Sequence, residues 1–434
     1  MLRRASMQDL SAQLAHVARA IADVLGRAGH RAWIVGGAPR DLCLARTPKE
    51  IDMASDAHPD AVEELFKHTI PVGRAFGTVI IHQAGIDVQH TTFRQEAGYS
   101  DARRPDGVAF GASVHEDSTR RDFTCNALYL DPLTDEFLDP QHGLDDLARR
   151  RLACVGDARQ RFEEDGLRLL RMARFAAVLE LEPADGMLEA ARAARETLRG
   201  VSPERVLAEL RVIFESASSA RALDLLESAG LLQRAVPGLW PESDPTARPA
   251  AWSRTRRMFA AFGAPPGLAL GLAALIDPPR LEVVEALRAS RAVQARVREI
   301  WELAAALGAP MSRAVARSQR IRWMRSAGFD DALVLARARA GIDGADTTAL
   351  DEIARERAEL GEAELQPERW ITSRDIEAAG VARGPAWSRL LEEAETLQLD
   401  RRVASRDEAL AWLRRRVESG AAPGHDGGNT PRRK

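Results

Sequence analysis

The chain has 434 residues and is 45% hydrophobic, which excludes a disordered or fibrous protein and predicts two to four domains. Its 61 basic and 64 acidic residues give a formal charge of −3, which argues against a uniformly basic coat protein for nucleic acid but allows a local basic face. Of the basic residues, 58 are arginine, and two explanations stay open. A bias in base composition would produce this excess, and so would a need for planar guanidinium groups at phosphates and base edges.

Three cysteines, Cys43, Cys125 and Cys154, are too few and too scattered for a disulfide framework or a zinc site. We expect small core or surface residues in a reducing compartment, the cytoplasm. The first 20 residues lack the apolar run of a secretion signal. The longest apolar stretch, 265–276, is about 12 residues long and too short to cross a bilayer, so we expect a soluble protein with no membrane segment.

The first 140 residues mix helical and strand patterns. Apolar residues at helical spacing from Leu10 to Leu25 predict an amphipathic helix that ends at Gly26. The elements expected after it are a strand at 32–35, a helix at 40–45, a strand at 51–54, a helix at 59–67, a hairpin of 79–82 with 87–93, and a strand at 126–130. This part is therefore α/β.

From Leu144 onward, nearly every segment is rich in Ala, Leu, Arg and Glu with apolar residues at i, i+3 and i+4. This pattern predicts that the rest of the chain is helical, divided into short helices by prolines. Residues 420–434 are rich in Gly, Pro and polar residues, which predicts a disordered C-terminus.

A double glycine, Gly36-Gly37, stands between the strand at 32–35 and a helix that carries Arg40. Such a turn lets the backbone approach a phosphate, and the arginine would hold its charge. An ordinary turn explains the glycines equally well.

Glu50 and Asp52 are two residues apart in an expected strand, so both carboxylates lie on one face. Two adjacent acids repel each other unless a cation lies between them. Mg²⁺ prefers carboxylate and phosphate oxygens, and two such ions can activate a hydroxyl and stabilise departing pyrophosphate. A solvated strand end is the alternative.

Two further segments combine arginines with acids. Arg121 and Asp122 adjoin a strand and suit a triphosphate and a ribose hydroxyl, although a charged loop would look the same. In the second segment, a series at i, i+3 spacing on one expected helix could offer acceptor and donor groups to a base edge and to phosphates, or form a solvated salt-bridge ladder. Its members are Asp165, Arg168, Arg171 and Arg174.

In this order, the segments resemble the class II tRNA nucleotidyltransferase/poly(A) polymerase family, and within it the CCA-adding enzymes. The matching motifs are GGAPRD, KEIDMAS, TTFR (91–94) with DARRP (101–105), RRDFTCNAL and EEDGLRLLRMARF, followed by SPERVLAEL at 202–210. The resemblance covers the first 215 residues. It implies an α+β fold, with a polymerase-β-like nucleotidyltransferase head built on a small mixed sheet and an all-helical neck, body and tail. The implied boundaries are 1–143 for the head, 144–236 for the neck, 237–365 for the body and 366–419 for the tail.

The resemblance implies template-independent addition of C and A from CTP and ATP to tRNA 3′ ends, with release of pyrophosphate. It implies that Glu50 and Asp52 are catalytic and hold Mg²⁺. Arg121 and Asp122 would meet phosphate and ribose, and Asp165 and Arg168 would read the base. The other nucleotide-binding residues implied are Gly36, Gly37, Arg40, Arg171 and Arg174.

This sequence departs from the family pattern at two acids: Glu50 stands where Asp is usual, and Gln89 where Glu is usual. Asp87, on the same strand face as Gln89, could replace the missing charge. The segment from Trp370 to Leu410 resembles the family's tRNA-binding tail, which favours tRNA over other RNA as the partner. The alternatives are a poly(A) polymerase, a partial CC- or A-adding enzyme, and a catalytically impaired RNA-binding member.

Overall fold

The computed structural model describes residues 2–73, 77–97, 107–111, 113–240, 248–308 and 315–419. The chain divides into two compact units, residues 1–271 with 280–290, and residues 272–279 with 291–434. The expected head and neck both lie in the first unit, and the expected body is divided between the two. These four boundaries stay a prediction, and the residues 101–105 and 420–434 lie outside the described part.

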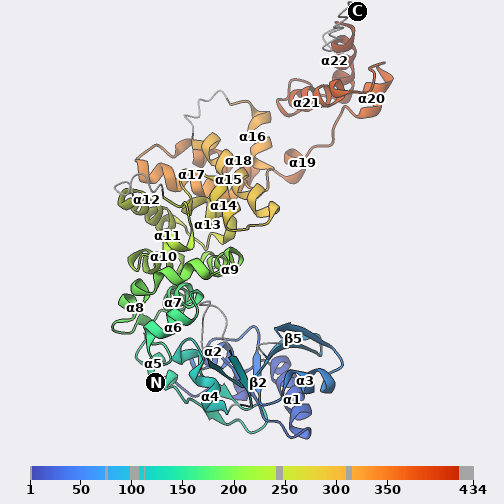
Figure 1. Ribbon diagram of the computed structural model, residues 1–434. Coiled ribbons are helices and arrows are strands. Elements are labelled where there is room, and N and C mark those ends of the chain that lie inside the picture. Colours follow the sequence, from blue (N-terminus) through green and yellow to red (C-terminus); the bar gives the residue numbers. More distant parts are fainter. Residues whose placement is uncertain are drawn as a thin grey trace, which may run out of the picture. The chain divides into compact units, whose positions relative to one another are not determined.

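A seven-stranded mixed sheet forms the centre of the first unit (Figure 1). Its order is β3-β4-β5-β2-β1-β8-β9, with β2 parallel to β5 and the other neighbours antiparallel. The strands are β1 (Ala32–Val35), β2 (Asp52–Ser55), β3 (Thr69–Gly73), β4 (Thr78–Gln83), β5 (Ile86–Thr92), β8 (Tyr129–Leu130) and β9 (Phe137–Leu138). A mixed sheet followed by helices confirms the expected α+β fold.

Apolar residues pack this sheet against helices. All four residues of β1 are buried, and Trp33 and Val35 pack with Ala54, Phe93 and Tyr129. The helices α1 (Ala12–Arg27) and α3 (Pro59–Leu65) pack against β1 and β4 (Figure 1). The burial of one face of α1 follows from the apolar spacing in its sequence.

The strand expected at 32–35 agrees with the structure, and so does the hairpin. The helix expected at 40–45 begins three residues earlier, as α2 (Gly37–Cys43), because Pro39 fits the first turn of a helix. The strand expected at 126–130 is shorter, because Thr124–Asn126 form a 3₁₀ turn before β8.

The part expected to be wholly helical contains one small sheet, so that prediction is wrong there. The strands β10 (Arg151–Leu152) and β11 (Glu182–Pro183) pair in parallel. Two residues are too few to produce a detectable period in the sequence. A second small sheet joins β6 (Arg94–Ala97) to β7 (Gly107–Phe110).

Helices make up most of what remains. Those of residues 114–290 are α4 (Val114–Thr119), α5 (Gly143–Ala148), α6 (Ala158–Glu164), α7 (Leu167–Val178), α8 (Met187–Ala193), α9 (Pro203–Phe214), α10 (Ser219–Ser228), α11 (Leu232–Ala235), α12 (Arg248–Ala261), α13 (Gly267–Leu275) and α14 (Leu281–Ala286). Those that follow are α15 (Arg291–Gly308), α16 (Arg317–Met324), α17 (Phe329–Asp343), α18 (Thr348–Glu359), α19 (Glu362–Leu365), α20 (Ser373–Ala378), α21 (Pro385–Leu399) and α22 (Arg406–Glu418).

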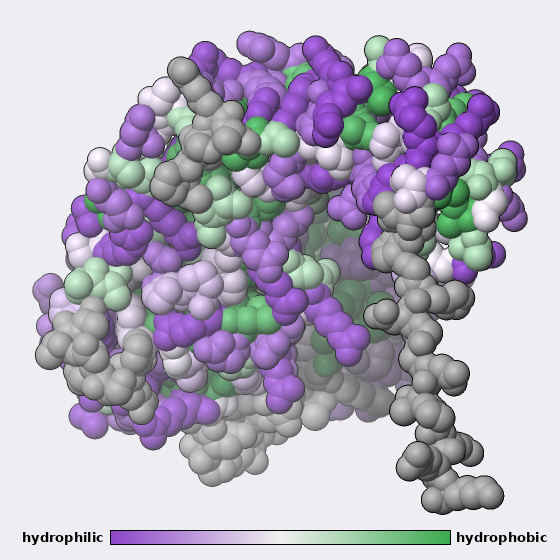
Figure 2. Space-filling view, turned by 90° about the horizontal axis from the view of Figure 1, so that it is seen from above, coloured by the Kyte–Doolittle hydropathy of each residue, from purple (hydrophilic) through white to green (hydrophobic). Residues whose placement is uncertain are grey.

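The last three helices have a small apolar core of their own, which includes Ile376 of α20, Leu390 of α21 and Leu413 of α22. The ion pair of Arg406 with Asp375, 2.7 Å long, joins α22 to α20. Figure 2 shows a face on which hydrophilic side chains predominate and hydrophobic ones form small separate patches. Among the helices that the structure describes, each is too short or too polar to span a membrane.

Candidate active site

The site lies where β1 and β2 meet the turn into α2. Val35, the last residue of β1, pairs with Asp52 on one side and with Tyr129 on the other. Gly36 follows at φ 73° and ψ −117°, a conformation that essentially only glycine adopts, and α2 begins at Gly37. The turn therefore brings the start of α2 beside the first residue of β2.

Arg40 projects from α2 and is 9% exposed. Its Nε and Nη2 lie 2.9 and 2.7 Å from Oδ1 of Asp41, and its Nη1 donates to Oδ1 of Asn126 at 2.7 Å. These contacts fix the guanidinium next to the double glycine, as the phosphate-binding hypothesis requires.

Asp52 and Glu50 supply the acids of the site. Asp52 is the first residue of β2, and Glu50 is exposed in the loop before it. Burial and the neighbouring charge of Glu50 raise the pKa of Asp52 to about 6, although Arg121 and Arg171 act to lower it. A partly buried acid beside a second negative charge is the situation that a bound cation relieves.

The expectation that both acids lie on one strand is wrong, because the strand begins at Asp52. Its neighbour β1 ends at Val35, and the chain turns away at Gly36, so Glu50 has no pairing partner on that side. On the other side, Asp52 pairs with Gln89 of β5. Asp87 is exposed, and its Oδ1 lies 2.7 Å from Nδ1 of His82.

Asp117 of α4, a buried acid that the sequence motifs did not indicate, binds the arginines next to β8. It forms ion pairs with Arg120 at 2.6 Å and Arg121 at 3.0 Å, and it accepts a hydrogen bond from the Tyr129 hydroxyl at 2.9 Å. Arg121 also donates to that hydroxyl oxygen at 2.9 Å. The spacing of i, i+3 and i, i+4 between this acid and the two arginines is the sequence signal that would have identified it.

Asp122 is bound on both carboxylate oxygens. One accepts from the Phe123 backbone N–H at 2.8 Å and from Asn126 at 3.1 Å, and the other lies 2.6 to 2.8 Å from two nitrogens of Arg171. Burial acts to raise the pKa of Asp122, but Arg171 and the hydrogen bond from Asn126 outweigh it and lower the pKa to about 2. Because Asn126 also binds Arg40, a continuous chain of contacts runs from α2 to α7.

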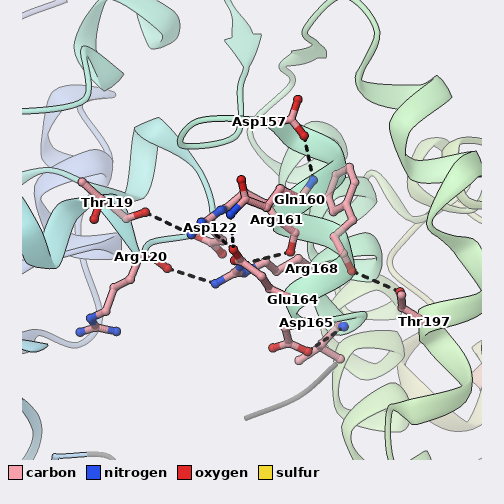
Figure 3. A network of polar contacts seen from close by, with 12 residues as sticks. Thr119, Arg120, Asp122, Asp157, Gln160, Arg161, Glu164, Asp165, Arg168 and Thr197 are labelled. Carbon is pink, nitrogen blue, oxygen red and sulfur yellow. Dashed lines mark hydrogen bonds and ion pairs between the residues drawn. The ribbon is translucent and has the colours of Figure 1, made fainter. Parts of the chain in front are cut away.

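Arg168 of α7 is buried among hydrogen-bond acceptors. Figure 3 shows it directed toward Glu164 and toward the backbone carbonyl of Arg120, at 2.7 and 3.0 Å. It also donates to the carbonyl of Arg161, whose own side chain reaches the carbonyl of Thr119 at 3.1 Å. These contacts hold the guanidinium in one orientation.

Asp165 does not lie on the helix that carries the arginines, so the expected continuous series is wrong at its first member. It is extended (φ −143°, ψ 107°) between α6 and α7. A Cβ atom on Gly166 would lie 2.6 Å from the carbonyl oxygen of Thr197, so the chain passes directly against another backbone there. Oδ1 of Asp165 accepts from the Leu167 N–H at 3.0 Å, and Oδ2 accepts from Arg205 at 2.9 Å.

Glu209 of α9 binds the last two arginines of the series. It lies 2.7 Å from Nε of Arg174 and 3.8 Å from Nη1 of Arg171. Glu209 and Arg205 belong to the motif 202–210, but no local signal assigns their partners, which are 35 and 40 residues away. The structure thus brings the predicted residues of α2, β2, α7 and the loop after α4 into one region.

The matches to family models agree with this geometry. Residues 32–153 match the model described as Poly A polymerase head domain, and residues 181–243 match that of the probable RNA and SrmB-binding site of polymerase A. The CCA-adding enzyme of Bacillus pumilus (strain SAFR-032) is 42% identical over 211 residues, which are 49% of this chain and 52% of that protein. That of Streptococcus uberis (strain ATCC BAA-854 / 0140J) is 42% identical over 187 residues, 43% of this chain and 46% of that protein. The chain thus spans about half the length of the curated relatives it matches.

Solved structures resemble the chain over nearly its whole length. The Bacillus stearothermophilus CCA-adding enzyme in complex with CTP is 29% identical with a TM-score of 0.75, and the match covers 94% of this chain and 99% of that one. The Thermotoga maritima CCA-adding enzyme complexed with tRNA_CCA shares the fold, with 15% identity, a TM-score of 0.66, and coverage of 96% and 100%.

The mixed-sheet head, with an acid pair beside fixed arginines, resembles the head domain of a nucleotidyltransferase. In residues 32–153 and 181–243 the chain resembles the tRNA nucleotidyltransferase/poly(A) polymerase family. Its curated relatives named above are CCA-adding enzymes, and this family generally uses a divalent metal ion. The acid pair of Glu50 and Asp52 fits such an ion, since burial and the neighbouring charge of Glu50 raise the pKa of Asp52 and a bound cation would favour its charged form.

Proposed function

We propose that this protein adds C and A nucleotides to the 3′ ends of tRNA, using CTP and ATP. The observation that carries the proposal is the position of Asp52, which is partly buried beside Glu50 and close enough to Arg121 and Arg171 for both to affect its pKa. An acid pair next to positive charge supports a metal ion bound beside a triphosphate. The CTP complex of the Bacillus stearothermophilus relative supports the choice of substrate.

In the reaction, the 3′-hydroxyl oxygen of tRNA attacks the α-phosphorus, and the bond from that phosphorus to the departing pyrophosphate breaks. Glu50 and Asp52 would hold Mg²⁺, which lowers the pKa of a hydroxyl and neutralises phosphate charge when bound. Arg40, Arg121 and Arg171 would bind the triphosphate through planar donors, with Gly36 and Gly37 allowing close approach and Arg174 adding charge.

Base selection follows from the groups that C and A share. Both present an amino group as a donor with a ring nitrogen acceptor beside it, whereas G and U present a carbonyl oxygen at the amino position. Asp165 would accept from the amino group and Arg168 would donate to the ring nitrogen. The contacts of Arg205 with Asp165 and of Glu164 with Arg168 would keep both groups oriented.

The partner is proposed to be tRNA, with the tail of residues 366–419 as a contact surface. The family model for an RNA-binding region at 181–243 supports an RNA substrate. We propose a cytoplasmic site of action, with which the three buried free cysteines agree, since disulfides are rare in a reducing compartment.

Incubation of the purified protein with tRNA that lacks its CCA end tests the proposal. With labelled CTP and ATP and with Mg²⁺, we expect addition of three nucleotides, and no addition by the Asp52→Asn variant. Asp165→Ala should admit GTP and UTP. Absence of incorporation with either Mg²⁺ or Mn²⁺ would refute the activity, and long A tails on arbitrary RNA would identify a poly(A) polymerase. Addition of only C or only A would identify a partial enzyme.

The substitutions at Glu50 and Gln89 motivate a second candidate, an RNA-binding protein with an impaired catalytic site. The variant that combines Glu50→Asp with Gln89→Glu distinguishes the two. A large rise from a barely detectable rate would favour the impaired protein, whereas a robust rate of the natural chain would exclude it.

A further inference from the structure

Phe175 lies where three of the nucleotide-site arginines converge. Its ring is 4.1 Å from the guanidinium carbon of Arg174, 5.1 Å from that of Arg171 and 5.3 Å from that of Arg40. Two of these arginines belong to α7, as Phe175 does, and the third belongs to α2. One aromatic ring therefore contacts positive charge from two elements, α2 and α7.

The ring is rigidly held. Phe175 is 6% exposed, and Phe123, which is fully buried, packs on it edge to face at 5.6 Å with an angle of 76° between the planes. The side chains of Arg40, Arg171 and Arg174 are 11%, 32% and 15% exposed. Attraction between a cation and an aromatic face is strongest where water is excluded, as it largely is here.

The aromatic ring attracts the three cations in a way that a further acid could not. The guanidinium groups repel each other, and each already pairs with one acid, namely Asp41, Asp122 or Glu209. A further carboxylate would give the cluster a formal negative charge and would repel the phosphates. The negative face of a ring attracts the cations without a formal charge, so it adds no repulsion toward a triphosphate.

We propose that Phe175 is a positioning residue that holds Arg40, Arg171 and Arg174 together as one triphosphate-binding cluster. This inference rests on the proposed function, because it assumes that these arginines meet the triphosphate. It predicts that the electron density of the ring, at constant ring shape, sets the affinity for the polyphosphate part of the nucleotide.

The experiment replaces Phe175 in the full chain with 4-fluoro-, 3,5-difluoro- and 3,4,5-trifluorophenylalanine by suppression of an amber codon. Each fluorine weakens the negative face and changes the volume little. The readouts are the Kd of inorganic tripolyphosphate by calorimetry, and KM and kcat for CTP with tRNA that lacks CCA. We expect Kd and KM to rise stepwise to about tenfold, which corresponds to about 1.4 kcal/mol, with kcat changed less than about twofold.

The control is the same series at Phe329, a buried phenylalanine of α17 that is 2% exposed and over whose ring the described residues place no guanidinium. Constant Kd and KM across the series at position 175 would overturn the inference, and so would an equal rise at both positions. Failure of the natural chain to bind tripolyphosphate would also overturn it. A stepwise rise in the Kd of tripolyphosphate without incorporation of CTP or ATP would support the role of Phe175 and refute only the proposed reaction.

Discussion

Arg171 donates from two nitrogens to a single oxygen of Asp122: its Nε lies 2.8 Å and its Nη2 2.6 Å from Oδ2. The two residues are 49 positions apart and join the loop after α4 to α7. The other oxygen of Asp122 accepts two further hydrogen bonds, so both carboxylate oxygens have partners within the protein. We therefore propose that Asp122 orients Arg171, while its contact with a ribose stays a prediction.

Substitution of Asp122 by asparagine should lower the free energy of unfolding by about 2–3 kcal/mol, because it leaves the Arg171 guanidinium without its charged partner. KM for CTP should rise as well. Urea titration and steady-state kinetics measure both effects.

The matched control is Glu163→Gln, which removes an acid whose pair with Arg159 is exposed, with side chains 50% and 64% accessible. Its effect on unfolding should be within about 0.5 kcal/mol. Equal effects of the two variants would show that the pair of Asp122 with Arg171 has no special role.

Asp52 should make the stability of the metal-free protein depend on pH. Its pKa is about 6 in the folded chain and near 3.8 when unfolded, so the folded state binds the proton more tightly. Stability linked to this group is therefore complete below pH 3.8 and is lost as the pH rises through 6, by about 3 kcal/mol. At pH 8 with a chelator, Asp52→Asn should thus be more stable than the natural chain.

Thermal unfolding measures the difference in stability between Asp52→Asn and the natural chain. This difference should be smaller at pH 4 and below than at pH 8. Added Mg²⁺ should raise the Tm of the natural chain and not that of the variant. A variant that is less stable at pH 8, or one that Mg²⁺ stabilises as strongly as the natural chain, would contradict the assignment of Asp52 as a metal ligand.

The two adjacent glycines should respond differently to alanine. Gly36 has φ 73° and ψ −117°, so Gly36→Ala should lower the free energy of unfolding by about 1–3 kcal/mol through backbone strain. Gly37 is the first residue of α2, and a Cβ there would meet only Nη2 of Arg40, at 3.6 Å. Gly37→Ala should therefore be tolerated in stability, within about 0.5 kcal/mol, but should raise KM for CTP. Chemical denaturation measures the free energy of unfolding of both variants. A larger loss of stability in Gly37→Ala than in Gly36→Ala would contradict this prediction.

Gln89 is the residue of β5 that pairs with Asp52, so Gln89→Glu would add an acid next to the metal site. We expect the Kd for Mg²⁺ to fall about three- to tenfold, because a carboxylate contributes charge that an amide lacks. Calorimetric titration measures the affinity. Gln83→Glu on β4 adds the same charge at a strand end that pairs with Ile86, and should leave the affinity unchanged. An unchanged affinity in Gln89→Glu would place this side chain outside the metal site.

Sequence patterns predicted several of the elements that carry the candidate site residues, but not the contacts among those residues. The strand at 32–35 was predictable because four consecutive apolar residues precede a double glycine. The position of Asp165 was not, because Glu163, Glu164 and Asp165 continue a helical composition. After the helix ends, the chain at Gly166 passes against the backbone of Thr197, 31 positions away, and no local period encodes this contact.

The partners of the arginines show the same limit. The ion pairs of Asp117 could be predicted from helical spacing, since Arg120 and Arg121 follow it by three and four residues. Glu209 was not, because it meets Arg174 only after α7 and α9 have packed together. Sequence motifs identify the charged residues, and the tertiary fold determines with which residue each of them forms an ion pair.

The backbone carbonyls of Thr119 and Arg120 at the end of α4 are bound by Arg161 and Arg168, which lie beyond the expected end of the head at residue 143. A protein cut at that boundary would lose these donors and would also leave Asp122 without Arg171. The mixed sheet is therefore not an exchangeable module by itself. A designer who wished to graft this head onto another RNA-binding scaffold would have to carry α6 and α7 with it.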